Sequence, residues 1–179
     1  MSRALTQAEE RSLRIGQERG RLVLALRHAS VVEKIQAYKR LERRLLKEVH
    51  TAAEAREVRR RIAEDLVTAT SDGPWRLFSP YLRRLERLGY STMDRRLLAC
   101  VMSAKASKGS PTGMRKTAEL VADIERRTRG RKYHPALREE INGALARARM
   151  FAGLNTDDVT ADGRKRRKKA APRDRRSVG

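Results

Sequence analysis

The chain of 179 residues carries 43 Lys and Arg against 22 Asp and Glu, a formal net charge of +21 at neutral pH. Such a charge opposes compaction unless a polyanion neutralises it, and RNA and DNA are the commonest candidates. The length suits one or two small domains, and the single cysteine, Cys100, excludes an intrachain disulfide or a cysteine-based zinc site. The longest early apolar run, residues 22–26, is too short for a secretory leader or a membrane span, so we expect a soluble cytoplasmic protein.

The apolar residues favour helices over strands. Hydrophobic residues make up 39% of the chain and aromatic residues only 4%, so Leu, Val, Ile and Ala supply most of any core. No segment shows the alternating pattern of a strand. We therefore predict an all-α protein, a compact bundle of about six to seven helices with a disordered basic C-terminal tail.

Three capping boxes open the first three predicted helices, which cover about residues 7–28, 31–49 and 52–70. Each box joins a Ser or Thr to a Glu three residues later: Thr6 with Glu9, Ser30 with Glu33, and Thr51 with Glu54. Behind each box the apolar residues step by three or four. The first helix is the weakest, because Gly16 and Gly20 interrupt it at a cost of roughly 1 kcal/mol each relative to Ala.

The Ser-Asp-Gly-Pro sequence of residues 71–74 breaks the helical pattern and marks the best internal boundary. Four further helices are predicted, from residue 79 to 89, from 92 to about 106, from the end of the 107–113 loop to 130, and from 135 to 153. The predicted domains are an N-terminal helical hairpin region (1–70), a linker (71–79) and a C-terminal helical bundle (80–154). Trp75 and Phe78 are assigned to packing around the linker, and Cys100 to the core.

Residues 155–179 lack apolar periodicity and are predicted to be a disordered basic tail. They contain nine basic and four acidic residues, so residues 1–154 keep most of the positive charge. The predicted helical part of the protein is therefore basic in its own right. This distinguishes the chain from a neutral domain that carries a basic tail.

Cations gather on single faces of two predicted helices. The face of the second helix repeats at i, i+3, i+4 and i+7 and consists of Arg40, Arg43, Arg44 and Lys47. The third helix carries Arg56, Arg59 and Arg60 on one flank, and Glu54, Glu57 and Asp65 are placed on the other. A solvated face with local ion pairs would explain the same residues. Because acidic residues are too few to pair with them all, we favour contacts to phosphates.

Two loops add further candidate contacts. In the first, Arg129, Arg131 and Lys132 surround Gly130 and precede Tyr133, which combines phosphate contacts with one stacking ring. A helix C-terminus with basic residues is the alternative reading. In the second, three cations flank the Ser-Gly-rich loop: Lys105, Lys108 and Arg115.

No motif supports catalysis, a metal or a cofactor. Residues 109–117 resemble a P-loop, but Lys116 does not follow Gly113 directly and no strand precedes the loop. The three histidines lack partners at ligand spacing, and no nucleophile is paired with a base. We expect neither an enzyme nor a cofactor.

Residues 85–92 resemble the turn of a helix-turn-helix, with Gly89 at the bend. Leu85 stands where a small residue is expected, and Arg95 where the second helix should be apolar. A sequence-specific DNA-binding protein is thus one alternative function. A second is a basic structural or adaptor protein, as in phage or ribosome assembly, that docks on an acidic protein.

An all-helical, arginine-faced chain of this size resembles the small subunit of multi-subunit CRISPR effector complexes, over about residues 30–153 and in size, helicity and charge layout. The resemblance implies a non-catalytic subunit in antiviral defence, present in several copies side by side and bound to larger protein subunits. It further implies contacts to the guide RNA–target duplex or to the displaced strand through the nucleic-acid backbone.

Overall fold

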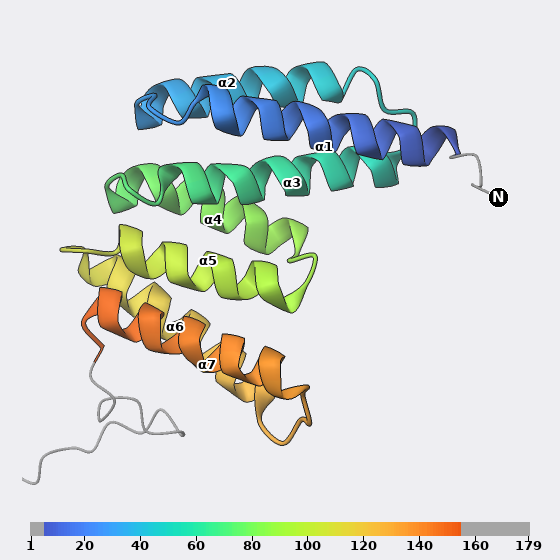
Figure 1. Cartoon of the computed structure of the whole chain (residues 1–179). Helices are drawn as coiled ribbons and strands as arrows, with labels where there is room; N and C mark the ends of the chain where they lie inside the picture. The colour runs from blue at the N-terminus through green and yellow to red at the C-terminus, as the bar shows by residue number, and fades with distance from the viewer. Residues whose placement is uncertain (1–5, 155–179) are drawn as a thin grey trace, which may run out of the picture.

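The computed structural model describes residues 6–154, which form seven α-helices and no strand (Figure 1). The helices are α1 (Gln7–Ala25), α2 (Val31–Leu45), α3 (Ala52–Thr70), α4 (Trp75–Leu88), α5 (Met93–Ala106), α6 (Pro111–Thr128) and α7 (Pro135–Ala152). The predicted all-α fold class is confirmed. The predicted tail, residues 155–179, lies outside the described residues.

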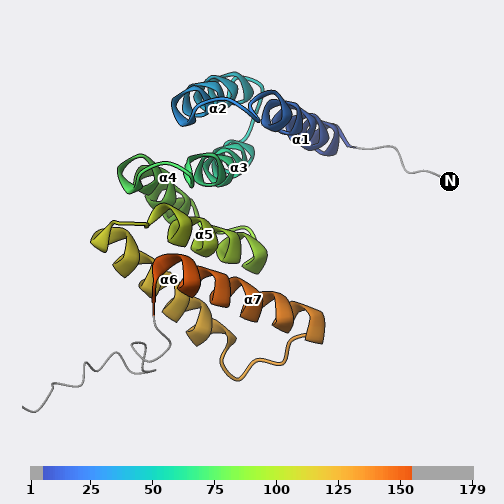
Figure 2. The same cartoon turned by 60° about the vertical axis from the view of Figure 1, so that its left-hand side comes forward.

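The helices stack in layers, and the chain reverses direction at each connection (Figure 1). Helices α1 and α2 lie side by side at one end, α3 and α4 follow, and α5, α6 and α7 form the other end (Figure 2). Helix α3 packs on α2 on one side and on α4 and α5 on the other. The division into domains at residues 71–79 stays a prediction, because α3 contributes to the packing on both sides.

Two apolar clusters fill the stack. The smaller cluster joins α2 to α3 through Tyr38, Leu41, Leu45, Val58, Ile62 and Leu66, and half-buried Ile15, Leu22 and Leu26 cover it from α1 and its C-terminal cap. The larger cluster spans α3 to α7 around Phe78, which is fully buried. It includes many alanines, and their small side chains let α5, α6 and α7 pack closely. Cys100 is buried in it as predicted, and burial raises the pKa of its thiol to about 12.

All three predicted capping boxes form. Thr6, Ser30 and Thr51 each accept a hydrogen bond from the backbone N–H of the Glu three residues later, and each Glu side chain bonds the N–H of its N-cap residue. These reciprocal bonds satisfy orphan donors at the helix starts, which is why the N-termini were readable from the sequence.

Four helix boundaries differ from the predictions by three residues or more. Helix α1 ends at Ala25 rather than at about residue 28. Helix α4 begins at Trp75 rather than at residue 79, because burial of Phe78 draws residues 75–79 into the helix, with Pro80 inside it. The break is therefore confined to residues 71–74. Helix α6 begins at Pro111, before Gly113, where an added Cβ would lie 2.9 Å from the Trp75 ring. Helix α2 ends at Leu45, one turn before Val49.

Arginine–carboxylate pairs connect neighbouring helices throughout the stack. Helix α1 is held to α3 by Arg11–Glu54 and Arg19–Asp65, to α2 by Arg44–Glu18, and to the turn after α2 by Arg14–Glu48. Further pairs join α2 to α4 (Glu42–Arg84), α3 to α5 (Glu64–Arg95), α5 to α6 (Arg96–Asp123) and α6 to α7 (Glu125–Arg149). These links occupy many of the described carboxylates, and Asp123 is shared by Arg96, Arg126 and Arg127.

The pair between Arg19 and Asp65 is the most enclosed connection of α1. The Arg19 Nε and Nη2 atoms donate to the two Asp65 carboxylate oxygens at 2.6 and 2.7 Å. The two side chains are only 16% and 15% exposed, and burial raises the pKa of the neighbouring Tyr38 hydroxyl to about 12. In such surroundings, loss of one partner leaves the other charge poorly solvated.

Replacing Arg19 by Met should lower the free energy of unfolding by about 2–3 kcal/mol, because Asp65 keeps an uncompensated charge. Chemical denaturation measures this loss. The exposed Arg21→Met change on the same helix is the control and should stay within about 0.5 kcal/mol. The Arg19→Met/Asp65→Leu double variant should recover part of the loss, and a single-variant loss as small as that of the control would contradict this role.

The link between α1 and α3 should also weaken in acid. The hydrogen bond from Arg11, followed by that of the His50 N–H, lowers the pKa of Glu54 from 4.5 to about 2. A carboxyl group whose pKa is depressed by folding contributes stability that is full above its unfolded pKa and lost as pH falls through its folded pKa. The stability difference between the wild type and Glu54→Gln should thus be constant near neutral pH and shrink from about pH 4.5 to pH 2. A pH-independent difference in denaturation midpoint would contradict this assignment.

Candidate nucleic-acid interface

The described residues carry more cations than their carboxylates can pair. Residues 6–154 contain thirty-three Lys and Arg, of which fourteen form ion pairs within 4.0 Å, so nineteen have no carboxylate partner among the described residues. Twelve of the eighteen described carboxylates take part in these pairs, and most of the twelve pair with a cation on another helix. The excess positive charge therefore lies on exposed surfaces, where only an external anion can neutralise it.

The largest concentration of these cations surrounds a hollow of about 910 Å³ between the end of α6 and one side of α7, here called the basic hollow. Its cations are Arg129, Arg131, Lys132, Arg138 and Arg149, and Glu125 is its one carboxylate. Glu125 forms an ion pair with Arg149 across the hollow. The other four cations have no described carboxylate partner, so the hollow is strongly electropositive.

The local sequence explains how the loop cations reach the hollow. Helix α6 ends at Thr128, and Gly130 adopts a φ of +72°, a left-handed conformation that glycine favours and that turns the chain. Helix α7 then starts at Pro135, and its N-cap residue, His134, makes no side-chain capping bond. The first turn of α7 contains no acidic residue, so its exposed N–H groups add to the positive potential around the loop.

The sequence analysis found Arg129, Arg131, Lys132 and Tyr133 but missed the contribution of α7. Arg138, Asn142 and Arg149 also line the hollow. Their spacing of four and seven residues puts them on the same face of a helix, next to the inward-facing Leu145. A helical projection of residues 135–152 could have found them.

The ring of Tyr133 is not free to stack on a base, contrary to the expectation from the sequence. Its half-buried ring packs against the larger apolar cluster, and its hydroxyl is buried with no hydrogen-bond partner among the described residues. Tyr133 is thus a packing residue in the wall of the hollow.

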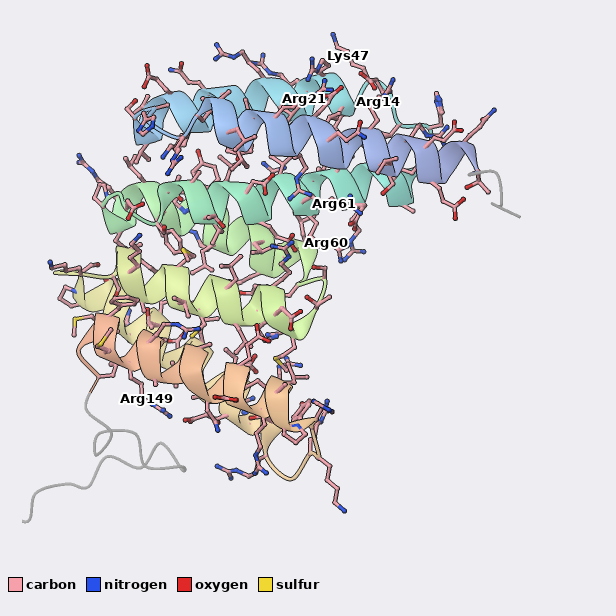
Figure 3. The ribbon with its side chains drawn as sticks, in the orientation of Figure 1. Arg14, Arg21, Lys47, Arg60, Arg61 and Arg149 are labelled. Atoms are coloured by element: carbon pink, nitrogen blue, oxygen red, sulfur yellow. The ribbon has the colours of Figure 1, made fainter. Side chains whose placement is uncertain are left out.

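A second electropositive surface lies between α1 and α2, at the opposite end of the stack. It is a groove of about 560 Å³ in which Arg21, Arg40 and Arg44 face an apolar floor. Arg44 is paired with Glu18, whereas Arg21 and Arg40 have no described carboxylate partner. Figure 3 shows Arg14, Arg21 and Lys47 on this layer, far from Arg149 on α7. Arg21 is a contact that the sequence analysis did not single out.

The remaining predicted residues are spread over other surfaces. Arg43 is exposed on α2 and Arg59 on α3, while the exposed Arg56 lies 3.4 Å from the Leu88 carbonyl oxygen. Lys47 is exposed but lies in the turn after α2, because this helix ends at Leu45. The predicted separation of Arg60 from Glu57 is wrong, because these residues are 60° apart on α3 and form an ion pair. Lys105 is paired with Asp72, whereas Lys108 and Arg115 are exposed at the start of α6.

The predicted turn of a helix-turn-helix is present, but its second helix is enclosed. Helix α4 ends at Leu88, Gly89 has a φ of +82°, and Thr92 caps α5. Helix α5 then packs against α3, α4, α6 and α7. A helix covered on so many sides cannot enter a major groove, so this geometry disfavours the DNA-reading alternative.

Within residues 6–154, no group of three or more His, Cys, Asp or Glu side chains could hold a metal ion. None of the helices in that range combines the length and apolar character needed to cross a bilayer. Comparisons with protein-family models, with curated proteins and with solved structures found no match to this chain.

Proposed function

We propose that this protein binds RNA or DNA through the sugar–phosphate backbone, without catalysis and largely independently of sequence, as a subunit of a ribonucleoprotein assembly. The observation that carries the proposal is the basic hollow, where four cations without described carboxylate partners converge. Arginine suits this role, because its planar fork donates two parallel hydrogen bonds to phosphate and stays charged at any physiological pH.

The spread of the unpaired cations favours a polymer over a small anion. One phosphate or carboxylate ligand would be satisfied by the hollow alone. The groove between α1 and α2 and the exposed faces of α2 and α3 carry further cations without described carboxylate partners, in other layers of the stack. A chain of phosphates can contact several such surfaces at once and release counterions at each.

Protein purified at low salt should carry nucleic acid, seen as a raised ratio of nucleic-acid to protein absorbance that falls after nuclease treatment or a high-salt wash. A protein partner that stays bound after nuclease treatment, with no nucleic acid in the untreated sample, would instead support the adaptor alternative. Mass spectrometry of the untreated sample tests the narrower CRISPR hypothesis, which requires larger effector subunits and a guide RNA.

The basic hollow should dominate affinity for oligonucleotides. The Arg129→Gln/Arg131→Gln/Lys132→Gln triple variant should bind single-stranded and duplex oligonucleotides of unrelated sequence roughly tenfold to a hundredfold more weakly. The slope of log affinity against log salt concentration should decrease in magnitude by about 2–3, because roughly 0.7–0.9 is lost per phosphate contact. Fluorescence anisotropy at several salt concentrations measures both quantities.

The matched control removes three exposed cations that line neither the hollow nor the groove: Arg83→Gln/Arg87→Gln/Arg147→Gln. It makes the same change in net charge and should weaken binding much less. Equal losses in the two triple variants would show that only overall charge matters and that the hollow is no site. A hollow variant that loses one sequence and spares others would show base-specific recognition instead.

A further inference from the structure

Helix α1 presents an apolar face that nothing in the described chain covers. Leu13, Val23 and Leu24 are 55%, 52% and 76% exposed, and they are three of the six large hydrophobic residues exposed in residues 6–154. The opposite side of α1 carries Ile15 and Leu22, which pack on the small apolar cluster. At 100° per residue, the exposed face is centred about 130° from this packed side.

The same face contains both glycines of the helix. Gly16 and Gly20 lie one turn apart, and a Cβ added at either position would have no atom within 4 Å. Both lie inside α1 with ordinary helical geometry, so no turn or close contact within the described chain requires a glycine there. Glycine weakens a helix interior, whereas a pair at this spacing lets a second helix approach the backbone closely.

Opposite charges stand at the two ends of this face. Glu9 lies near its start, and Arg27 follows its end in the turn after α1. Both are exposed and neither has an ion-pair partner among the described residues. The Glu9 carboxylate bonds Thr6 through Oε2, which leaves Oε1 open to another cation.

These residues are arranged symmetrically about position 18. Gly16 and Gly20 lie two residues to either side, Leu13 and Val23 five, and Glu9 and Arg27 nine. The five that lie in α1 fall within a sector of about 80° around the helix axis, and Arg27 follows in the turn after it. When two copies of this face lie antiparallel, an apolar residue of one faces an apolar residue of the other, glycine faces glycine, and an acidic residue faces a basic one.

We propose that α1 pairs with α1 of a second copy of this chain, antiparallel, about a two-fold axis at the level of residue 18. In this arrangement the glycine pairs cross, Leu13 of each copy meets Val23 of the other, and Glu9 of each copy meets Arg27 of the other. A parallel pairing would oppose Glu9 to Glu9 and Arg27 to Arg27, which the charges disfavour. Such a self-complementary contact closes into a dimer.

The dimer leaves the contacts of α1 within its own chain intact. Arg11, Arg19 and Ile15 point to the packed side, toward α3 and the small cluster. Arg21, which lines the groove, lies about 120° from the centre of the exposed face. A protein built as a stack of helices normally needs a polar terminal helix to stay soluble as a monomer. A two-fold contact through α1 would therefore also explain why this terminal helix has an apolar face.

One helix pair of this length is smaller than a standard interface of about 1,600 Å², so the monomer and dimer should exchange at micromolar concentrations. Analytical ultracentrifugation of the full chain, freed of nucleic acid by nuclease and high salt, should show a concentration-dependent dimer. Removal of nucleic acid separates this test from the proposed function, since RNA or DNA could otherwise bridge two copies.

The decisive variant is Gly16→Gln/Gly20→Gln. Its larger side chains should block the crossing and shift the dimer–monomer equilibrium at least tenfold toward monomer. The same change should raise the thermal stability of the monomer, because glutamine is the better helix former and open space surrounds both positions. A dimer that is unaffected, or a chain that is monomeric at every concentration, would overturn the proposal.

A charge exchange tests the orientation. Arg27→Glu should weaken the dimer by opposing two carboxylates, and the Glu9→Arg/Arg27→Glu double variant should restore it. Arg83→Glu makes the same charge change on α4 and serves as the control, with no effect on self-association expected. Failure of the double variant to recover the dimer would reject the antiparallel register.

Discussion

The fold depends on the packing of two apolar clusters, and ion pairs between arginines and a small number of carboxylates add further links between helices. The most extensive helix contacts, those of α5 with α7, α3 with α4 and α2 with α3, are apolar, whereas Arg–carboxylate pairs bridge α1 to α3, α2 to α4, α5 to α6 and α6 to α7. In a chain with about twice as many basic as acidic residues, each such pair removes an anion from the surface as well as a cation. The structural pairs therefore leave most of the remaining surface charge positive.

This division between structural and surface cations was only partly predictable from the sequence. The sequence identified the face of α2 by its spacing, but spacing cannot reveal which arginine finds a partner 26 residues away, as Arg44 does with Glu18. The pair of Glu57 and Arg60 could have been predicted, because a spacing of three residues places both side chains on one face of α3. Pairing between helices depends on their relative placement, which the pattern of one helix does not encode.

The helix starts, by contrast, were predictable because their signals are local in the sequence. A capping box is a local set of hydrogen bonds, so Ser30 and Glu33 specify it without reference to the rest of the chain. The start of α4 depends instead on burial of Phe78 in the larger cluster, and tertiary packing overrode the local signal of Pro80. The basic hollow combines both cases: its loop cations are contiguous in sequence, but Arg149 joins them only because α7 folds back along α6.

The two proposed surfaces lie at opposite ends of the stack, and this placement links them. Helix α1 forms one end, and the basic hollow lies beside α6 and α7 at the other (Figure 1). A two-fold pairing through α1 would therefore carry the two hollows to the outer ends of the dimer, with the α1–α2 grooves nearer its centre. An isolated phosphate could use one hollow only. A nucleic acid long enough to reach both would gain from the second contact as an intramolecular step, so the dimer would favour long polyanions over short ones even if every individual phosphate contact were identical.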